Sequence, residues 1–450
     1  MIIAIKPLLS KISLDLKKRV FFTLLIIVVY RIGVNIPIPG INIESIKFLF
    51  LKHQNNGILN ILDIFSGGAL RKMSIFSMGV VPYINSSIII NLIQGAHIVP
   101  YLDKLNREGE YGRKKINQII KYLTLILGTV QAFILTLTMI KMSIRLYLPI
   151  VIDISFSWIF LSIITLVTGT MLIMWLGEQI TEVGIGNGIS IIIFAGIVEK
   201  TPRIFFRIIK LIQNKLLSLK YIFLLLVIMS IMFIILIWVE TAYRKIYIHY
   251  VKKMSGEKLY NEDISFLPIK LEQSGVMAVI FATSILSTFI IIFQFVISRY
   301  NVLNFIIIKK FIKPIISNLV IYNIVYACLI LFFCYFYNSI SFDTIEIADN
   351  IRRLEGYVPN VRPGKQTSIY IYNVLKGITL WGAIFVIMIA IAPDYLSYIF
   401  NIPFLFNGTS LLIVIGVSLD VICQVESYII TKNYERYSIL HTKKKKMVKI

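Results

Sequence analysis

Apolar residues fall in ten long runs along the chain, and polar segments separate them. A helix needs about 20 apolar residues to cross a bilayer, and helices satisfy their own backbone hydrogen bonds there. The pattern therefore predicts an all-α polytopic membrane protein with ten transmembrane helices. We place these helices near residues 20–37, 74–98, 118–140, 154–175, 184–199, 220–240, 275–298, 315–337, 375–392 and 409–430.

The apolar stretch 58–98 is roughly twice as long as one span requires. We expect it to divide into a short piece near 60–73, which enters the membrane and turns back, and a full span over 74–98. Gly67 and Gly68 give the short piece the backbone freedom that a turn needs.

Polar residues mark both pieces of this stretch. Arg71 and Lys72 would be costly in lipid, so the short piece must face protein or water. Pro82 is expected to bend the first half of the span, which also carries Asn and Ser residues. A half-inserted piece before a kinked, polar span indicates an aqueous pathway. The alternative is a packing kink whose polar residues bond to neighbouring helices.

Composition supports a membrane protein, and the distribution of basic residues indicates on which side of the membrane the termini lie. Hydrophobic residues make up 57% of the chain, charged residues 15%, and the mean hydropathy is +0.82. Most of the 46 lysines and arginines lie in segments on the side of the two termini, so the positive-inside rule places both termini in the cytoplasm. The basic segment 200–220 runs against this bias. The net charge of +23 could indicate nucleic-acid binding, but positive-inside bias explains it more simply.

We find no pattern that indicates catalysis or a cofactor. The three cysteines lie inside apolar runs, with neither disulfide nor metal-site spacing, and we expect no metal and no cofactor. "GIGNG" at 184–188 lacks the context of a phosphate loop and is interpreted as a tight entry to the fifth span. Glu178 and Glu182 are expected at an interface or cavity rather than in a catalytic role. We therefore expect that the protein is not an enzyme.

Five ordered stretches carry a resemblance to a known family. The chain resembles the SecY family of protein-translocation channels from Arg31 to Tyr428. The stretches are "FSGGALRKMSIFSMGVVPYINSSIII", "REGEYGRKKINQ", "GTMLIMWLGEQITEVGIGNGISIIIFAGIV", "ADNIRRLEGYVPNVRPGKQT" and "FNGTSLLIVIGVSLDVICQVESY".

The resemblance implies two pseudo-symmetric five-helix halves, 1–199 and 200–430, followed by a basic cytoplasmic tail at 431–450. A plug helix would lie at about 60–72, with Ile64, Phe65, Ser66, Gly67 and Gly68 at its centre. It also implies a ring of aliphatic side chains at the waist, which would resist ions by dewetting. The ring residues would be Val80, Ile84, Ile189, Ile193, Ile280 and Ile413.

Helices two and seven would form a lateral gate through which hydrophobic segments pass into lipid. Its polar residues would be Asn91 on helix two and Thr283, Ser284, Ser287 and Thr288 on helix seven. Taken singly, a ring residue could instead face lipid or pack in the core, and a gate residue could instead make an ordinary Ser/Thr contact between helices.

The cytoplasmic loops 241–274 and 338–376 would dock a SecA-like motor ATPase and the ribosome. The docking residues would be Arg362, Arg244, Lys245, Lys252 and Lys253. The resemblance further implies SecE-like and SecG-like membrane subunits, secretory and membrane-protein clients, contact with membrane lipids, and a bacterial inner membrane or a plastid membrane.

Four positions depart from the family pattern. They are Ala278 for proline, Glu272 for asparagine, Asn407 for glycine, and Glu257 for a basic residue. The alternative function is a secondary transporter, which also uses broken helices. The aliphatic waist residues argue against it, since a transporter needs convergent polar groups at the midplane.

Overall fold

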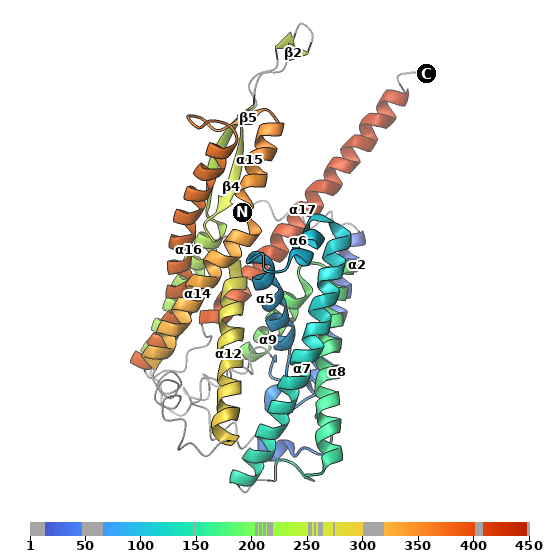
Figure 1. The fold of residues 1–450 in the computed structure, drawn as a ribbon, viewed down its shortest axis with the longest axis vertical. Helices are drawn as coiled ribbons and strands as arrows, with labels where there is room; N and C mark the ends of the chain where they lie inside the picture. The colour runs from blue at the N-terminus through green and yellow to red at the C-terminus, as the bar shows by residue number, and fades with distance from the viewer. Residues whose placement is uncertain are drawn as a thin grey trace. The chain divides into compact units, whose positions relative to one another are not determined.

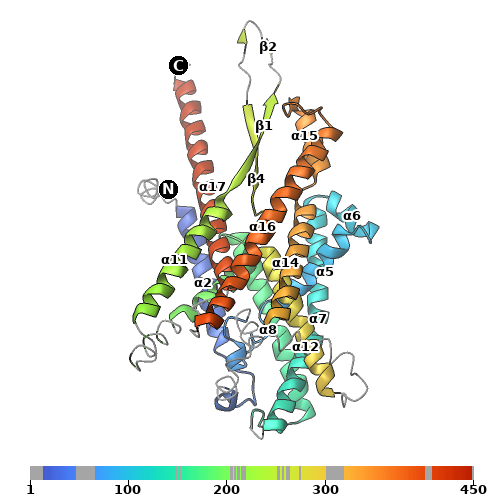
Figure 2. The same ribbon diagram turned by 90° about the vertical axis from the view of Figure 1, so that its left-hand side faces the viewer.

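Ten helices of the computed structural model match the ten predicted spans (Figure 1 and Figure 2). They are α2 (Leu14–Val34), α5 (Val81–Gly95), α7 (Glu110–Leu146), α8 (Phe156–Val183), α9 (Gly188–Val198), α11 (Leu219–Thr241), α12 (Gly275–Arg299), α14 (Leu319–Ser341), α16 (Lys365–Phe400) and α17 (Gly408–Met447). The structure describes residues 14–46, 66–146, 149–152, 154–202, 206, 209, 213, 219–250, 254–255, 258–259, 264–272, 275–299, 319–400 and 408–447.

Length and apolar composition identify the spanning helices directly. Within the described ranges, stretches of α7, α8, α14, α16 and α17 are long and apolar enough to cross a membrane. Shorter apolar stretches lie at Leu226–Thr241 in α11 and Val276–Ile290 in α12. Many large apolar side chains of these helices are exposed, as a lipid-facing surface requires.

The second predicted span begins later than we expected. Ser74 forms an isolated bridge with Pro37, residues 75–80 form consecutive turns, and the helix starts at Val81. The turns persist because this segment bonds to the chain after α2: Ile38 N–H donates to Met73 O (2.9 Å) and Ile75 N–H to Ile36 O (3.0 Å). The expected bend at Pro82 was therefore wrong. Pro82 lies in the first helical turn, where no backbone donor is needed.

Contacts divide the chain into two compact units. The first comprises residues 1–83, 121–203 and 413–450, and the second comprises 84–120 and 204–412. The predicted halves 1–199 and 200–430 follow an expected pseudo-symmetry rather than contact density, so this division stays a prediction.

In the first unit, the entry to α9 has the predicted form. Gly186 has a φ of +81°, and the Asn187 side chain caps the helix by accepting from the N–H of Ile189 (3.2 Å). Gly188 then lies so close to α8 that an added Cβ would fall 1.9 Å from the carbonyl oxygen of Gly177. "GIGNG" is therefore a tight helix entry and not a phosphate loop.

In the second unit, α12 packs on α14 and α14 on α16 (Figure 1). The segment we expected as the loop 241–274 contains a twisted hairpin instead, made of β1 (Tyr243–Tyr250) and β4 (Ile264–Lys270) (Figure 2). β1 also pairs with β5 (Gly356–Tyr357), so the sheet order is β4-β1-β5. The short strands β2 (Met254–Ser255) and β3 (Lys258–Leu259) pair separately.

Alternation along β1 explains the hairpin. Ile246 and Ile248 are buried, whereas their neighbours Lys245 and Tyr247 are exposed. The buried face packs on Ile269 of β4 and on apolar residues of α15 (Thr344–Arg353) and α16. The other short helices are η2 (Leu70–Lys72) and α6 (Pro100–Arg107).

A polar network around the turn at residues 66–68, and the α5–α12 contact

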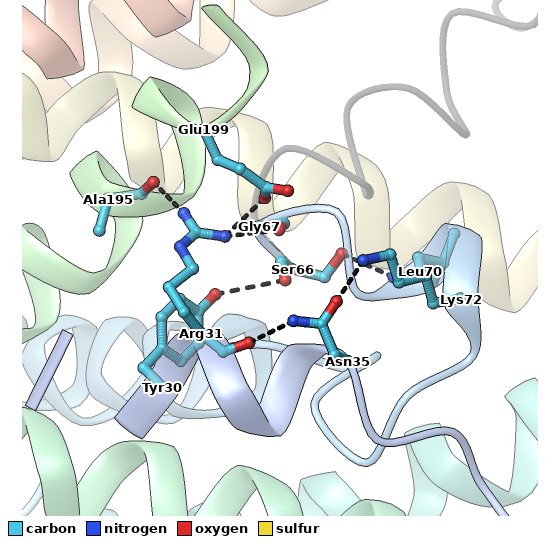
Figure 3. A network of polar contacts seen from close by, with 9 residues as sticks. All are labelled: Tyr30, Arg31, Asn35, Ser66, Gly67, Leu70, Lys72, Ala195 and Glu199. Atoms are coloured by element: carbon cyan, nitrogen blue, oxygen red, sulfur yellow. Dashed lines mark hydrogen bonds and ion pairs between the residues drawn. The ribbon is translucent and has the colours of Figure 1, made fainter. Parts of the chain in front are cut away.

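The turn at residues 66–68 is the centre of a polar network in the first unit (Figure 3). Gly67 and Gly68 adopt φ of +62° and +84°, in the left-handed region that glycine tolerates. An added Cβ on Gly67 would lie 2.4 Å from the Tyr30 hydroxyl oxygen and 3.2 Å from Gly196 Cα. The predicted need for glycines here is confirmed, and close packing adds a second reason for it.

Arg31 in the last turn of α2 contacts three segments. Its Nη1 donates to the Glu199 carboxylate (2.5 Å) and to the carbonyl oxygen of Gly67 (3.2 Å), and its Nη2 donates to the carbonyl oxygen of Ala195. Figure 3 shows the guanidinium between Glu199, Ala195 and the turn. The rigid arginine fork suits several acceptors at fixed directions. One side chain therefore joins α2, the end of α9 and the turn.

Further contacts bind the turn to α2. The Tyr30 hydroxyl donates to the carbonyl oxygen of Ser66 (3.3 Å), and the Tyr30 ring stacks on Phe76 at 5.8 Å. Ser66 Oγ accepts from the N–H of Leu70 (3.2 Å), which begins η2. Lys72 Nζ donates to the neutral Asn35 Oδ1 at an exposed position, so one of the two predicted basic residues has a polar partner. Only 1% of the surface of Ser66 is exposed.

The predicted plug lies partly in this region. Ile64 and Phe65 lie outside the described residues. Ser66, Gly67 and Gly68 form the buried turn just described, and Arg71 is exposed, as a hydrated face requires.

Polar residues join α5 and α12 in the second unit. Asn85 Nδ2 donates to the hydroxyl of Thr288 (2.8 Å). The predicted gate residues Thr283, Ser284 and Ser287 are buried in α12, and two of them donate to backbone carbonyls of their own helix. Asn91 is half-buried. Asn85, rather than Asn91, therefore makes the described side-chain contact to α12.

The predicted ring residues are aliphatic and mostly buried. Ile84, Ile193, Ile280 and Ile413 each expose 4% or less of their surface, and Ile189 is half-buried. Val80 is also buried, but it lies in the turn before α5, not within the helix as we expected, because the 75–80 turns delay the helix start.

The predicted docking residues lie on the sheet and the turn that precedes α16. Arg244 and Lys245 are exposed on β1, whereas Lys252 and Lys253 lie outside the described residues. Arg362 is exposed, and its carbonyl oxygen accepts from the Thr367 hydroxyl (2.9 Å). Asn360 and Gly364 flank it with φ of +63° and +97°, so a tight turn presents its side chain.

The sequence interpretation missed Arg31 and Glu199 as site residues. Arg31 lies inside the predicted span 20–37 and Glu199 ends the predicted span 184–199, and ionisable residues in such positions are expensive unless they find partners. An arginine and a glutamate in different apolar runs were a usable signal. Glu178 likewise forms an ion pair, with Lys121 (2.7 Å). Glu272 differs, since it is 4% exposed with no hydrogen bond to either carboxylate oxygen among the described residues.

Comparison with solved structures defines the fold as that of a protein-conducting channel. One structure, described as that of a protein conducting channel, covers 93% of this chain and 93% of its own, with a TM-score of 0.65 and 16% identity. A structure concerning the SecY plug domain, and its stabilisation of the closed state, covers the same shares with a TM-score of 0.66 and 17% identity.

Sequence comparisons identify the family. A sequence model of the SecY family matches residues 74–422. The protein translocase subunit SecY of Buchnera aphidicola (subsp. Schizaphis graminum) is 39% identical over 95% of this chain and 95% of its own. That of Escherichia coli K12 is 38% identical over 94% and 93%.

The chain belongs to the SecY family. It is a multi-pass membrane protein and the pore-forming subunit of a protein-conducting channel, and it is not an enzyme. The predicted family, fold class and function are confirmed, which removes the secondary transporter as an alternative.

Proposed function

We propose that the chain passes unfolded polypeptides across a membrane and releases hydrophobic segments into lipid between α5 and α12. The observation that carries this proposal is the contact of these helices through the neutral Asn85–Thr288 hydrogen bond (2.8 Å). Polar contacts between transmembrane helices contribute only about 0.6–2 kcal/mol each. A contact of this strength keeps two helices together at rest and yields when an apolar segment competes.

Covalent joining of the two helices tests lateral release. We would replace Cys328, Cys334 and Cys423 by serine, introduce Asn85→Cys with Thr288→Cys, and join the thiols with a short cleavable reagent. Joined channels should fail to insert membrane-protein clients, and cleavage of the reagent should restore insertion. Unimpaired insertion by fully joined channels would contradict a gate at this contact.

The second unit offers a matched control. Asn338 Nδ2 donates to the Thr379 hydroxyl between α14 and α16, the same Asn–Thr chemistry at a different helix pair. Joining Asn338→Cys to Thr379→Cys should leave insertion intact. Loss of insertion in both pairs would mean that general rigidity, and not a gate at α5 and α12, explains the result.

The proposal includes closure by a ring and a plug. Val80, Ile84, Ile189, Ile193, Ile280 and Ile413 form the ring, and residues 60–72 form the plug. Support comes from the aliphatic, largely buried character of the ring residues and from the turn at Gly67 and Gly68. Polar substitution wets an apolar constriction. Serine at several ring positions should let ions through the resting channel, and unchanged planar-bilayer conductance would remove the ring assignment.

Docking is proposed at the turn that precedes α16 and at the hairpin. Arg362, Arg244, Lys245, Lys252 and Lys253 would contact a SecA-like motor ATPase or the ribosome. One solved relative is described as Sec61 in a ribosome–channel complex, with a TM-score of 0.62. SecE-like and SecG-like subunits would complete the channel in a bacterial plasma membrane, with both termini in the cytoplasm.

A charge reversal tests the docking proposal. Arg362→Glu should abolish motor-driven translocation, because a reversed charge at a docked pair costs several kcal/mol. The side chain is exposed, so folding and insertion should continue. Export at the parent rate, with the variant at parent abundance, would refute the role of Arg362.

A further inference from the structure

Glu199 supplies the carboxylate of the 66–68 network, at the end of α9. Glu199 follows the last residue of α9 and is its C-cap. A negative side chain is unfavourable at a helix C-terminus, where the helix dipole is already negative. Arg31 offsets this, since it pairs with the carboxylate and also donates to Ala195 O in the last turn of the same helix.

The contacts of Arg31 with Glu199 and Ala195 fix the direction of the Nη1 N–H that donates to the carbonyl oxygen of Gly67. Its Nη1 carries two N–H groups, and the same nitrogen contacts Glu199 and the carbonyl oxygen of Gly67. The two side chains of the pair are 23% and 24% exposed, so solvent screens the pair only in part. With Glu199 and Ala195 as its other acceptors, the guanidinium points toward the turn.

We propose that Glu199 is a positioning residue for channel closure: it orients Arg31 so that the plug turn can leave and return to one defined place. The inference rests on the proposed plug. Departure of the turn breaks the contacts from Arg31 to Gly67 O and from Tyr30 to Ser66 O, both of which end on neutral carbonyls. The Arg31–Glu199 ion pair lies between α2 and the end of α9 and remains when the turn moves. The site for the returning turn is therefore preserved.

Gly68 supports this arrangement. A Cβ added at Gly68 would lie 3.4 Å from Glu199 Oε2, so the carboxylate lies beside the turn. Glutamine has nearly the same shape as glutamate but no charge, and Glu199→Gln therefore isolates the electrostatic role.

The experiment measures exposure of the turn. In a background with Cys328, Cys334 and Cys423 replaced by serine, Ser66→Cys reports exposure through its reaction with a membrane-impermeant thiol reagent. Ser66 is buried at rest, so the parent should react slowly. Glu199→Gln should speed the reaction in the resting channel about tenfold, which corresponds to about 1.4 kcal/mol.

Two further variants separate charge from shape. Glu199→Asp keeps the carboxylate and should return the rate to within about threefold of the parent. Arg31→Lys keeps the positive charge but loses the fork, and it should react about as fast as Glu199→Gln. A rate for Glu199→Asp equal to that of Glu199→Gln, or a parent-like rate for Arg31→Lys, would overturn the positioning role.

The matched control is Glu178→Gln. Glu178 forms an ion pair with Lys121 at 2.7 Å in the same unit, with side chains 28% and 37% exposed. Loss of that pair should leave the reaction of the Ser66→Cys probe unchanged. A tenfold increase in this control as well would mean that any lost ion pair loosens the unit, which would also overturn the proposal.

The Ser66→Cys protein without a substitution at Arg31 or Glu199 tests the plug separately. With a translocating client trapped in the channel, the Ser66→Cys probe should react faster than at rest. Equal rates in the two states would refute the plug itself. A faster rate with the client, together with a parent-like rate for Glu199→Gln at rest, would leave the plug in place and overturn only the role of Glu199.

Discussion

The 66–68 turn and the α5–α12 contact are both polar, yet they are built differently. The turn is fixed by a charged side chain with three acceptors, by a tyrosine hydroxyl, and by glycines at positive φ. The α5–α12 contact has a neutral amide-to-hydroxyl hydrogen bond. Charged, multi-acceptor contacts fix position, whereas single neutral contacts between helices separate at low cost. The first arrangement suits an element that must return to one place, and the second suits a surface that must open.

Removal of the charge at the turn should have the largest effect on stability. Arg31→Ala leaves the Glu199 carboxylate without its arginine and leaves the carbonyl oxygens of Ala195 and Gly67 without this donor. Breaking a fully buried pair costs about 3–5 kcal/mol, and partial exposure reduces this to about 2 kcal/mol. The midpoint of thermal unfolding in detergent would measure the loss.

Lys121→Ala is the comparison for that measurement. Its ion pair with Glu178 is more exposed on the lysine side, so the expected loss is below about 1 kcal/mol. Equal losses in Arg31→Ala and Lys121→Ala would mean that the network at the turn adds nothing beyond an ordinary ion pair.

The next largest loss of stability is expected from substitution of Gly67 in the turn. Gly67→Ala should destabilise the unit by about 1–2 kcal/mol, because alanine is strained at a φ of +62° and its Cβ would meet the Tyr30 hydroxyl at 2.4 Å. Gly377→Ala is the control, since an added Cβ there meets nothing within 4 Å and alanine favours a helix. If Gly377→Ala lowered the unfolding midpoint as Gly67→Ala does, the geometry of the turn would not explain the loss of stability.

Glu272 sharpens the comparison with Glu199, because it is a buried carboxylate that makes no hydrogen bond to an arginine among the described residues. Burial, and then the negative charge of Glu240, raise the pKa of Glu272 well above its usual 4.5. The folded state therefore binds this proton more tightly than the unfolded state. Stability is highest below pH 4.5 and falls as the pH rises toward the raised pKa.

Glu272→Gln should remove that decline. At pH 8 the free energy of unfolding of the variant should exceed that of the parent by about 1 kcal/mol, so the variant should unfold at a higher temperature. This difference should shrink at pH 5. Unfolding midpoints measured across this range would decide it. A variant less stable than the parent at pH 8 would mean that the Glu272 carboxylate is charged and paired in the folded protein.

The smallest effect is expected at the α5–α12 contact. A double-mutant cycle with Asn85→Ala and Thr288→Ala should give a coupling free energy of about 0.6 kcal/mol. The same cycle with Asn338→Ala and Thr379→Ala gives the reference for an Asn–Thr contact between α14 and α16. A coupling above about 2 kcal/mol at Asn85 and Thr288 would contradict a contact that opens easily.

The sequence predicted the helices well because apolar runs of spanning length have few other solutions in a membrane. It misplaced the start of α5, since the turns at 75–80 depend on hydrogen bonds to residues 36 and 38 that no local pattern contains. The hairpin was missed although "YRKIYIHY" alternates with period two in its middle. The basic residues of this segment indicate a cytoplasmic loop, and only the alternation of its apolar residues indicates a strand.

Site residues were predictable only where a motif contained them. "FSGGALRK" indicated the turn and the backbone freedom of its two glycines, and the structure shows that both glycines use this freedom to adopt positive φ. An ionisable residue in each of two apolar runs marked Arg31 and Glu199 as candidates, but their pairing could not be predicted, because each charge has several possible partners until the helices pack. The same holds for Asn85 and Thr288, which are 203 residues apart.

The Arg31–Glu199 pair also has a consequence for the order of synthesis. Its members are separated by 168 residues. At translation rates of about 5–20 residues per second, α2 would wait roughly 10–30 s for α9 to be made. During that interval an arginine sits at the end of an apolar helix without its carboxylate, and such a charge favours the interface over the bilayer interior. The first helix of the channel is therefore expected to reach its final depth only after the fifth has been made.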